Sequence, residues 1–190
     1  MRTGIASRKT KETEISIALS LDGGSVEIAT GIGFFDHMLE AFAVHGGFGL
    51  SIKANGDLHV DGHHTVEDTG IVLGKALADA LGDKDGIRRY GNFRLPMDES
   101  LACASVDISG RPYLVFNAHF PQERVGEYDT CLTEEFFRAF AFHAGITLHM
   151  AVEYGENSHH MIEALFKAAA HALQEAITPR EGLLSTKGLL

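Results

Sequence analysis

The chain has 190 residues, enough to bury a hydrophobic core as one domain or as two small half-domains fused into one unit. Its formal net charge is −10, and no basic stripe exists that would neutralise nucleic-acid phosphates. No apolar run approaches the length of a membrane span, and residues 1–11 are too polar for a signal-peptide core. These features exclude nucleic-acid-binding and membrane proteins, and they predict a globular protein of the cytoplasm.

Histidine is the unusual residue of this sequence. The chain has 11 histidines, and four of them form the adjacent pairs His63-His64 and His159-His160. The two cysteines have no close C-x-x-C partner and are expected to be reduced packing residues. The histidine pairs are therefore the first candidates for functional residues.

The first half of the chain is predicted to hold five secondary-structure elements. Residues 14–20 alternate apolar and polar side chains, and the turn at 22–24 predicts a hairpin with the strand that follows. Phe34, Met38 and Phe42 recur at the spacing of a helix face. In chain order the elements are strands over 14–20 and 25–29, a helix over 34–45, a strand over 48–54 and a helix from about 65 to 81.

The second half is predicted to repeat this order. Its elements are strands near 101–108 and 113–120, a helix over 134–144, a strand over 146–153 and a helix over 159–177. The repeat thus predicts an α+β fold made by tandem duplication of a β-β-α-β-α unit.

Residue identities support the same duplication. Residues 40–45 align with 138–143, and residues 63–67 align with 159–163 once a two-residue gap is allowed. Because both matches occur in the same element order, an internal repeat is favoured over chance. The expected halves are residues 1–95 and 96–190, which together form one domain.

Each histidine pair belongs to a His-His-x-x-Glu motif on a predicted helix. Residues four apart share a helix face, so His63 can share a metal ion with Glu67, and His159 with Glu163. The second histidine of each pair points roughly 100° away and would serve a different ion. A pseudo-symmetric arrangement gives one ion His63, Glu67, His160 and Glu135, and the other His159, Glu163, His64 and His37.

This ligand set favours a transition metal. Imidazole and carboxylate without thiolate suit manganese, iron or zinc, and the composition of the set does not choose among them. A single motif would be typical of a capped or solvent-exposed helix start, whereas two copies in corresponding positions of a repeat favour ligation. His45 and His143 end their helices, where histidine interacts favourably with the terminal carbonyls.

Five segments of the chain match the motifs of a known family. They are residues 31–39 (GIGFFDHML), 61–68 (DGHHTVED), 109–113 (SGRPY), 155–164 (GENSHHMIEA) and 185–188 (STKG). The chain resembles the imidazoleglycerol-phosphate dehydratase family over residues 11–187. The resemblance implies a fold of the ribosomal protein S5 domain 2-like type, in which two four-stranded sheets enclose the helices.

The resemblance also implies an activity and an assembly. The reaction is conversion of D-erythro-imidazoleglycerol phosphate to imidazoleacetol phosphate and water in histidine biosynthesis, with two Mn²⁺ ions binding the imidazolate form of the substrate. The implied assembly is a homo-oligomer of 24 subunits with cubic symmetry and active sites between protomers. No additional phosphatase domain is indicated.

Further site residues follow from the resemblance alone. Glu12 would be the base that takes the carbon-bound proton, while His45 and Asp98 would position or handle protons. The substrate phosphate would be bound by Arg89, Arg111, Lys167, Ser185 and Lys187, with Glu12 also contacting the substrate. Many family members carry histidine where this chain has Glu135, whose carboxylate can still ligate manganese and would add negative charge.

Two other functions remain open on the sequence. Paired metal ions beside Arg and Lys also suit a dinuclear hydrolase of phosphate esters. A non-catalytic metal-binding assembly protein would carry the same ligands. Release of inorganic phosphate separates the hydrolase from the dehydratase, and indifference to loss of Glu12 would favour the assembly protein.

Overall fold

The computed structural model describes residues 1–182 and 184–185 of the chain. The first half contains β1 (Thr3–Lys9), β2 (Thr13–Ser20), β3 (Val26–Ala29), α1 (Gly33–Gly46), β4 (Gly49–Gly56) and α2 (His63–Leu81). The second contains β5 (Tyr90–Met97), β6 (Ser100–Asp107), β7 (Tyr113–Asn117), β8 (Arg124–Val125), β9 (Tyr128–Asp129), α3 (Leu132–Ala144), β10 (Thr147–Tyr154) and α4 (Ser158–Ala176). All five predicted elements of each half are present.

The two halves form equivalent four-stranded sheets. The strand orders are β1-β2-β4-β3 and β5-β6-β10-β7, and in each sheet the last pair is parallel while the others are antiparallel. This correspondence of topology confirms the predicted α+β fold of two four-stranded sheets. The boundary expected at residues 95 and 96 falls inside β5, which pairs with β6 along its whole length.

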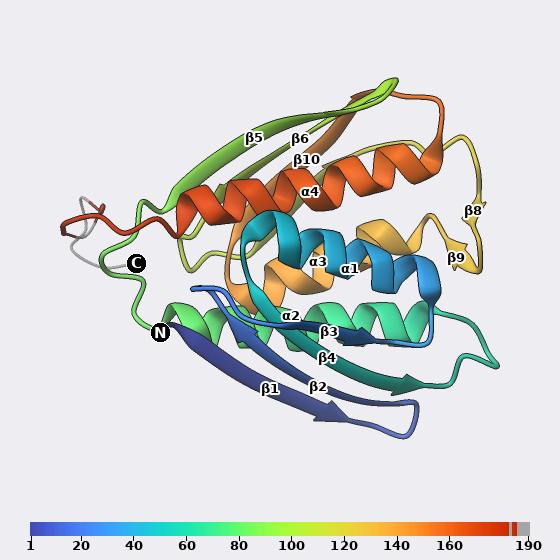
Figure 1. The fold of residues 1–190 in the computed structure, drawn as a ribbon, viewed down its shortest axis with the longest axis horizontal. Coiled ribbons are helices and arrows are strands. Elements are labelled where there is room, and N and C mark those ends of the chain that lie inside the picture. Colours follow the sequence, from blue (N-terminus) through green and yellow to red (C-terminus); the bar gives the residue numbers. More distant parts are fainter. Residues whose placement is uncertain (183, 186–190) are drawn as a thin grey trace.

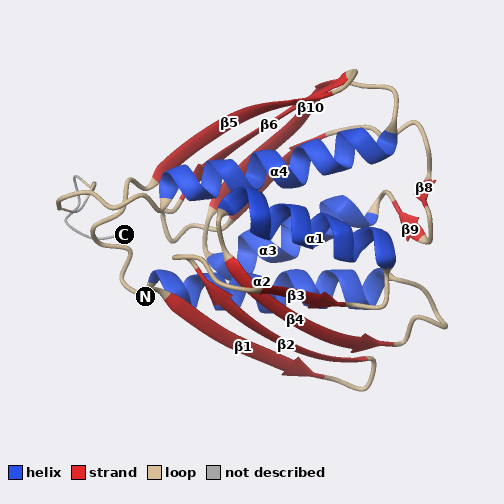
Figure 2. Ribbon diagram, viewed as in Figure 1, coloured by secondary structure: helices blue, strands red, loops and turns tan. Residues whose placement is uncertain are grey.

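The helices lie between the sheets (Figures 1 and 2). Helices α1 and α2 cover the inner face of the first sheet, and α3 and α4 cover that of the second. Across the middle of the molecule α1 packs on α4, and α2 packs on α3. The inward side chains of β2 and β6 are almost fully buried against these helices, as an amphipathic strand requires. The pairing of α1 with α4 brings the two halves together at the functional site.

The hairpin predicted from residues 14–29 is wrong. Strand β2 forms its hairpin with β1, and β4 lies between β2 and β3. Strand β3 instead pairs in parallel with β4, from Val26 opposite Leu50 to Ala29 opposite Lys53. The turn at 22–24 therefore carries the chain across β4 rather than back along β2.

Each half also begins with a strand that the sequence pattern did not predict. In β1 and β5 the buried position nearest the helix is a glycine, Gly4 or Gly91. A Cβ on Gly4 would lie 1.9 Å from the carbonyl oxygen of Ala76, and one on Gly91 would lie 1.8 Å from that of Ala172. The helix backbone approaches so closely that no larger residue fits, and the alternation typical of a strand is lost.

Among the described residues, no helix is both long and apolar enough to span a bilayer.

Candidate metal centre

Two helix starts place the candidate ligands. Helix α1 lacks a side-chain cap at Ile32, and Asp36 in its first turn instead accepts hydrogen bonds from the backbone N–H and hydroxyl of Thr30. Helix α4 is capped by Asn157, whose side-chain oxygen accepts from the N–H of His159. Both helices thus have defined first turns, from which His37 and His159 project toward each other.

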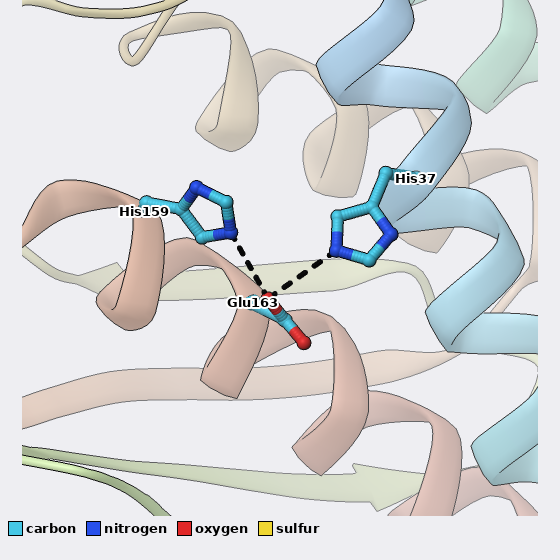
Figure 3. A group of neighbouring side chains, drawn as sticks. All are labelled: His37, His159 and Glu163. Carbon is cyan, nitrogen blue, oxygen red and sulfur yellow. Dashed lines mark hydrogen bonds and ion pairs between the residues drawn. The ribbon is translucent and has the colours of Figure 1, made fainter.

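His37, His159 and Glu163 form the group that can hold a metal ion (Figure 3). One ligand atom from each lies within 4.8 Å of the others. The Nε2 atom of His159 is 3.1 Å from Oε2 of Glu163, and Nε2 of His37 is 3.5 Å from the same oxygen. Two imidazoles and a carboxylate converging on one point are a donor set that manganese, iron or zinc accepts. The residues therefore fit a divalent cation.

Glu163 is the buried member of this group, with 6% of its surface exposed. Burial alone would raise its pKa, but the ammonium of Lys167, 2.6 Å away, and His37 more than offset burial, so the pKa of Glu163 is lowered. The carboxylate is therefore ionised and able to bind a cation. Lys167 lies one turn further along α4, as its four-residue spacing from Glu163 requires.

The corresponding residues of the other repeat are less closely gathered. Nε2 of His63 lies 3.7 Å from Oε2 of Glu67 at the start of α2. Glu135, at the start of α3, contacts Arg138 on its own helix at 3.5 Å. Within the described residues, only His37, His159 and Glu163 bring three ligand atoms of histidine, cysteine or carboxylate side chains within 4.8 Å of one another. The packing of α2 on α3 nevertheless repeats the packing of α1 on α4.

His64 and His160, the second histidines of the motifs, are each held by a carboxylate. Nδ1 of His64 lies 3.1 Å from Asp57, and Nδ1 of His160 lies 2.7 Å from Glu99. These hydrogen bonds raise the pKa of both imidazoles. In each case Nδ1 contacts the carboxylate, which leaves Nε2 for another partner. Histidines that bind metal ions are often oriented by a carboxylate in this way. Neither histidine joins the His37 group.

The predicted proton-handling residues lie near the second histidines. An oxygen of Glu12, in the turn between β1 and β2, is 4.0 Å from Nε2 of His64. Asp98, in the turn between β5 and β6, is 3.7 Å from Nε2 of His160. His45 lies two turns beyond His37, where its Nδ1 is 3.3 Å from Nε2 of His171, and burial lowers its pKa.

The predicted phosphate-binding arginines lie far from the metal group. The N–H of Arg89 donates to the carbonyl of Ala176 at the end of α4, whereas Glu163 is near the beginning. Thirteen residues of helix separate these positions by about 20 Å. Within one chain, Arg89 and the His37 group cannot contact the same small substrate.

Both arginines contact Asp107. The Arg89 guanidinium donates two hydrogen bonds to Asp107 and one to the carbonyl of Leu184, and Arg111 lies 3.7 Å from the same carboxylate. Ser185 lies close by in sequence, one residue beyond Leu184. Lys187 lies outside the described residues.

Asp57 and Glu99 are the site residues that sequence analysis missed. Each was an ordinary acidic residue beside a turn. Glu99 carried a usable signal, because it directly precedes β6 as Glu12 directly precedes β2. No such signal marked Asp57, because the loop from β4 to α2 is longer than the loop from β10 to α4 and the repeat gives Asp57 no counterpart.

Comparisons with known proteins agree with this geometry. The family model described as imidazoleglycerol-phosphate dehydratase matches residues 30–173. Proteins of that name from Methylorubrum extorquens and Alkaliphilus metalliredigens are 56% and 59% identical to the chain. The first alignment covers 100% of both chains, and the second covers 96% of each.

Solved structures give the same result. A crystal structure of imidazoleglycerol-phosphate dehydratase from Staphylococcus aureus superposes with a TM-score of 0.86 at 46% identity, covering 94% of this chain and 99% of the other. A crystal structure of the protein of the same name from Pyrococcus furiosus has a TM-score of 0.86 at 39% identity, covering 97% of this chain and 99% of the other. The resemblance seen in the sequence motifs is confirmed over the whole fold, and the chain belongs to the imidazoleglycerol-phosphate dehydratase family.

Proposed function

We propose that this chain is a manganese-dependent hydro-lyase that converts imidazoleglycerol phosphate to imidazoleacetol phosphate and water in histidine biosynthesis. The observation that carries the proposal is the convergence of His37, His159 and Glu163 in a chain that matches this family along its length. A metal-binding group alone would also suit a hydrolase. Family membership at 56% identity over the full length favours the dehydratase.

Two Mn²⁺ ions would be held by equivalent ligand sets of the two halves. His37, His159 and Glu163 would hold one ion, and the corresponding Glu135, His63 and Glu67 would hold the other. His64 and His160 would complete these sets from another copy of the chain. This assignment is supported by the carboxylates of Asp57 and Glu99, which occupy Nδ1 of each histidine and leave Nε2 for a ligand.

The same reasoning supports active sites between protomers of a 24-subunit assembly. Arg89 and Arg111 lie at the opposite end of α4 from the metal group. A substrate bound at the metals of one chain would therefore meet these arginines on another copy. Lys167, with Ser185 and Lys187, would add further positive charge and hydrogen-bond donors for the phosphate.

The protein's own groups divide the chemistry. Bound Mn²⁺ would supply positive charge that favours the imidazolate form of the substrate ring. Glu12 would accept the proton from the carbon beside the ring-attached carbinol, and its position 4.0 Å from His64, a proposed metal ligand, supports this role. His45 and Asp98 would hold neighbouring groups in position, and the cationic side chains would fix the phosphate.

Incubation of the purified protein with imidazoleglycerol phosphate and Mn²⁺ tests this function. We expect imidazoleacetol phosphate to accumulate without free inorganic phosphate, and both products can be followed in the same sample. Release of inorganic phosphate would show a phosphate-ester hydrolase instead. Absence of both products from protein that contains manganese would leave a metal-binding assembly protein.

A further inference from the structure

The turn that carries Glu12 is tied to helix α2 by a continuous chain of hydrogen bonds. The hydroxyl of Thr13 donates to Oδ2 of Asp68 at 2.5 Å. The hydroxyl oxygens of Thr13 and Thr10 are 3.3 Å apart, and that of Thr10 accepts from the N–H of Glu12 at 3.0 Å. Because an ionised carboxylate only accepts, Thr13 donates to Asp68 and Thr10 donates to Thr13. The chain thus runs in one direction from the backbone of Glu12 to Asp68.

Asp68 is well placed to hold this turn. It directly follows Glu67, the last residue of the first His-His-x-x-Glu motif, and it is 5% exposed. Its other oxygen accepts from the guanidinium of Arg8 on β1 at 2.8 Å. One buried side chain on the ligand-bearing helix therefore contacts strands on both sides of the turn.

The second repeat has no carboxylate at the position of Asp68. The position of Asp68 in the second motif is occupied by Ala164, which has no hydrogen-bonding side chain. The equivalent turn carboxylate, Glu99, accepts hydrogen bonds from the N–H groups of Glu156 and Asn157 and from His160. Glu99 is thus held by its own side chain.

Glu12 is held differently. Its carboxylate is 55% exposed and lies 4.0 Å from His64, whose Nδ1 is already oriented by Asp57. The turn is fixed through its backbone, so the carboxylate itself need not form a fixed hydrogen bond. This arrangement leaves the carboxylate oxygens available to accept a proton from substrate.

We propose that Asp68 is a positioning residue for the dehydration: it fixes the turn between β1 and β2 and so sets the distance from Glu12 to the substrate. This inference rests on the proposed role of Glu12 as base. A displacement of about 1 Å in a reacting group can lower a rate roughly a hundredfold. Loss of the Asp68 contact is therefore expected to lower kcat about 10-fold to 100-fold, with little change in KM or manganese content.

Variants of Thr13 and Asp68 test the proposal by steady-state kinetics and metal analysis. Thr13→Val removes the hydroxyl but keeps a branched side chain, whereas Thr13→Ser keeps the hydroxyl donor. We expect Thr13→Val and Asp68→Asn to lower kcat, and Thr13→Ser to remain near the wild-type value. Asp79→Asn is the matched control, because Asp79 also accepts from β1, at the N–H of Ile5, but far from the turn. Equal kcat values for Thr13→Val and Thr13→Ser would overturn the proposal.

A double-mutant cycle separates this inference from the function on which it rests. If Asp68 acts through Glu12, adding Asp68→Asn to Glu12→Gln will not lower kcat further. A further loss equal to that in the wild-type background would overturn the positioning role and indicate a general effect on the fold. Full activity of Glu12→Gln alone would instead contradict the proposed base. If Glu12→Gln lowers kcat while the single variants Asp68→Asn and Thr13→Val each keep the wild-type kcat, the positioning role of Asp68 is contradicted and the role of Glu12 as base is not.

Discussion

Replacing Glu163 by glutamine is expected to abolish most of the activity, because it removes the buried charge of the metal group. Glutamine keeps an oxygen in a similar position but is neutral. The Lys167 ammonium, which lies 2.6 Å from Oε1 of Glu163 in the wild-type protein, would lose its counter-charge. Loss of groups that merely orient a ligand lowers metal affinity or activity about 10-fold to 100-fold, so a direct ligand should exceed this. Metal content and kcat should fall together.

Glu175→Gln is the matched control for this variant. Glu175 lies three turns further along α4, where it contacts the N–H of Asn92 and the guanidinium of Arg88. This substitution should leave manganese content and kcat unchanged. A Glu163→Gln protein with full manganese content and wild-type kcat would contradict the assignment of the metal site.

The same variant can test whether active sites form between copies of the chain. Arg111→Ala should also be inactive or nearly so, because its guanidinium is assigned to the substrate phosphate. When the two inactive proteins are unfolded and refolded together, some sites will pair an intact Glu163 with an intact Arg111 from another copy. Recovery of activity in the mixture is expected, and its complete absence in correctly assembled mixed particles would place both residues in one chain's site.

Glu12→Gln is expected to lower kcat by about 10²-fold to 10⁴-fold, the range associated with loss of a general base. Glu12 is 55% exposed and its carboxylate is not needed for the hydrogen bonds that hold the turn, so the variant should fold normally. Glutamine can still occupy the position but cannot accept the proton. Substrate binding and manganese content should therefore change little.

Glu14 provides the control on the same hairpin. It is 62% exposed and pairs with Lys9, away from the candidate ligands. Glu14→Gln should retain wild-type kcat. The Glu12→Gln variant can also be supplied to a histidine-requiring host that is grown without histidine. Growth at the rate seen with the wild-type protein would contradict the role assigned to Glu12.

Sequence patterns predicted the elements whose apolar faces are wide. Helix α1 was found from the spacing of Phe34, Met38 and Phe42, of which Met38 and Phe42 are almost completely buried. Helices α2 and α4, which carry the two motifs, were likewise predicted, with the start of α2 placed two residues too late. Strands β1 and β5 were missed because Gly4 and Gly91 replace the apolar residues that normally mark a buried strand face.

The candidate site was only partly predictable. Helical spacing relates His159 to Glu163, and the pseudo-symmetric arrangement of the repeat assigned His37 to the same ion. Local sequence does not show the packing of α1 on α4 that brings His37 to them. The roles of Asp57, Glu99 and Asp68 depend on contacts across turns and loops, which have no periodic signal. The position of Arg89 at the far end of α4 follows from the path of β5, and Arg111 lies beside it through their shared contact with Asp107, which no local pattern in the sequence predicts.

Removal and return of manganese tests whether the dehydration depends on bound metal. The purified protein is stripped with a chelator, titrated with Mn²⁺, and followed for imidazoleacetol phosphate while bound metal is counted. We expect stripping to abolish product formation, and we expect activity to return as the manganese content approaches two ions per chain. Undiminished conversion of imidazoleglycerol phosphate by metal-free protein would contradict this dependence.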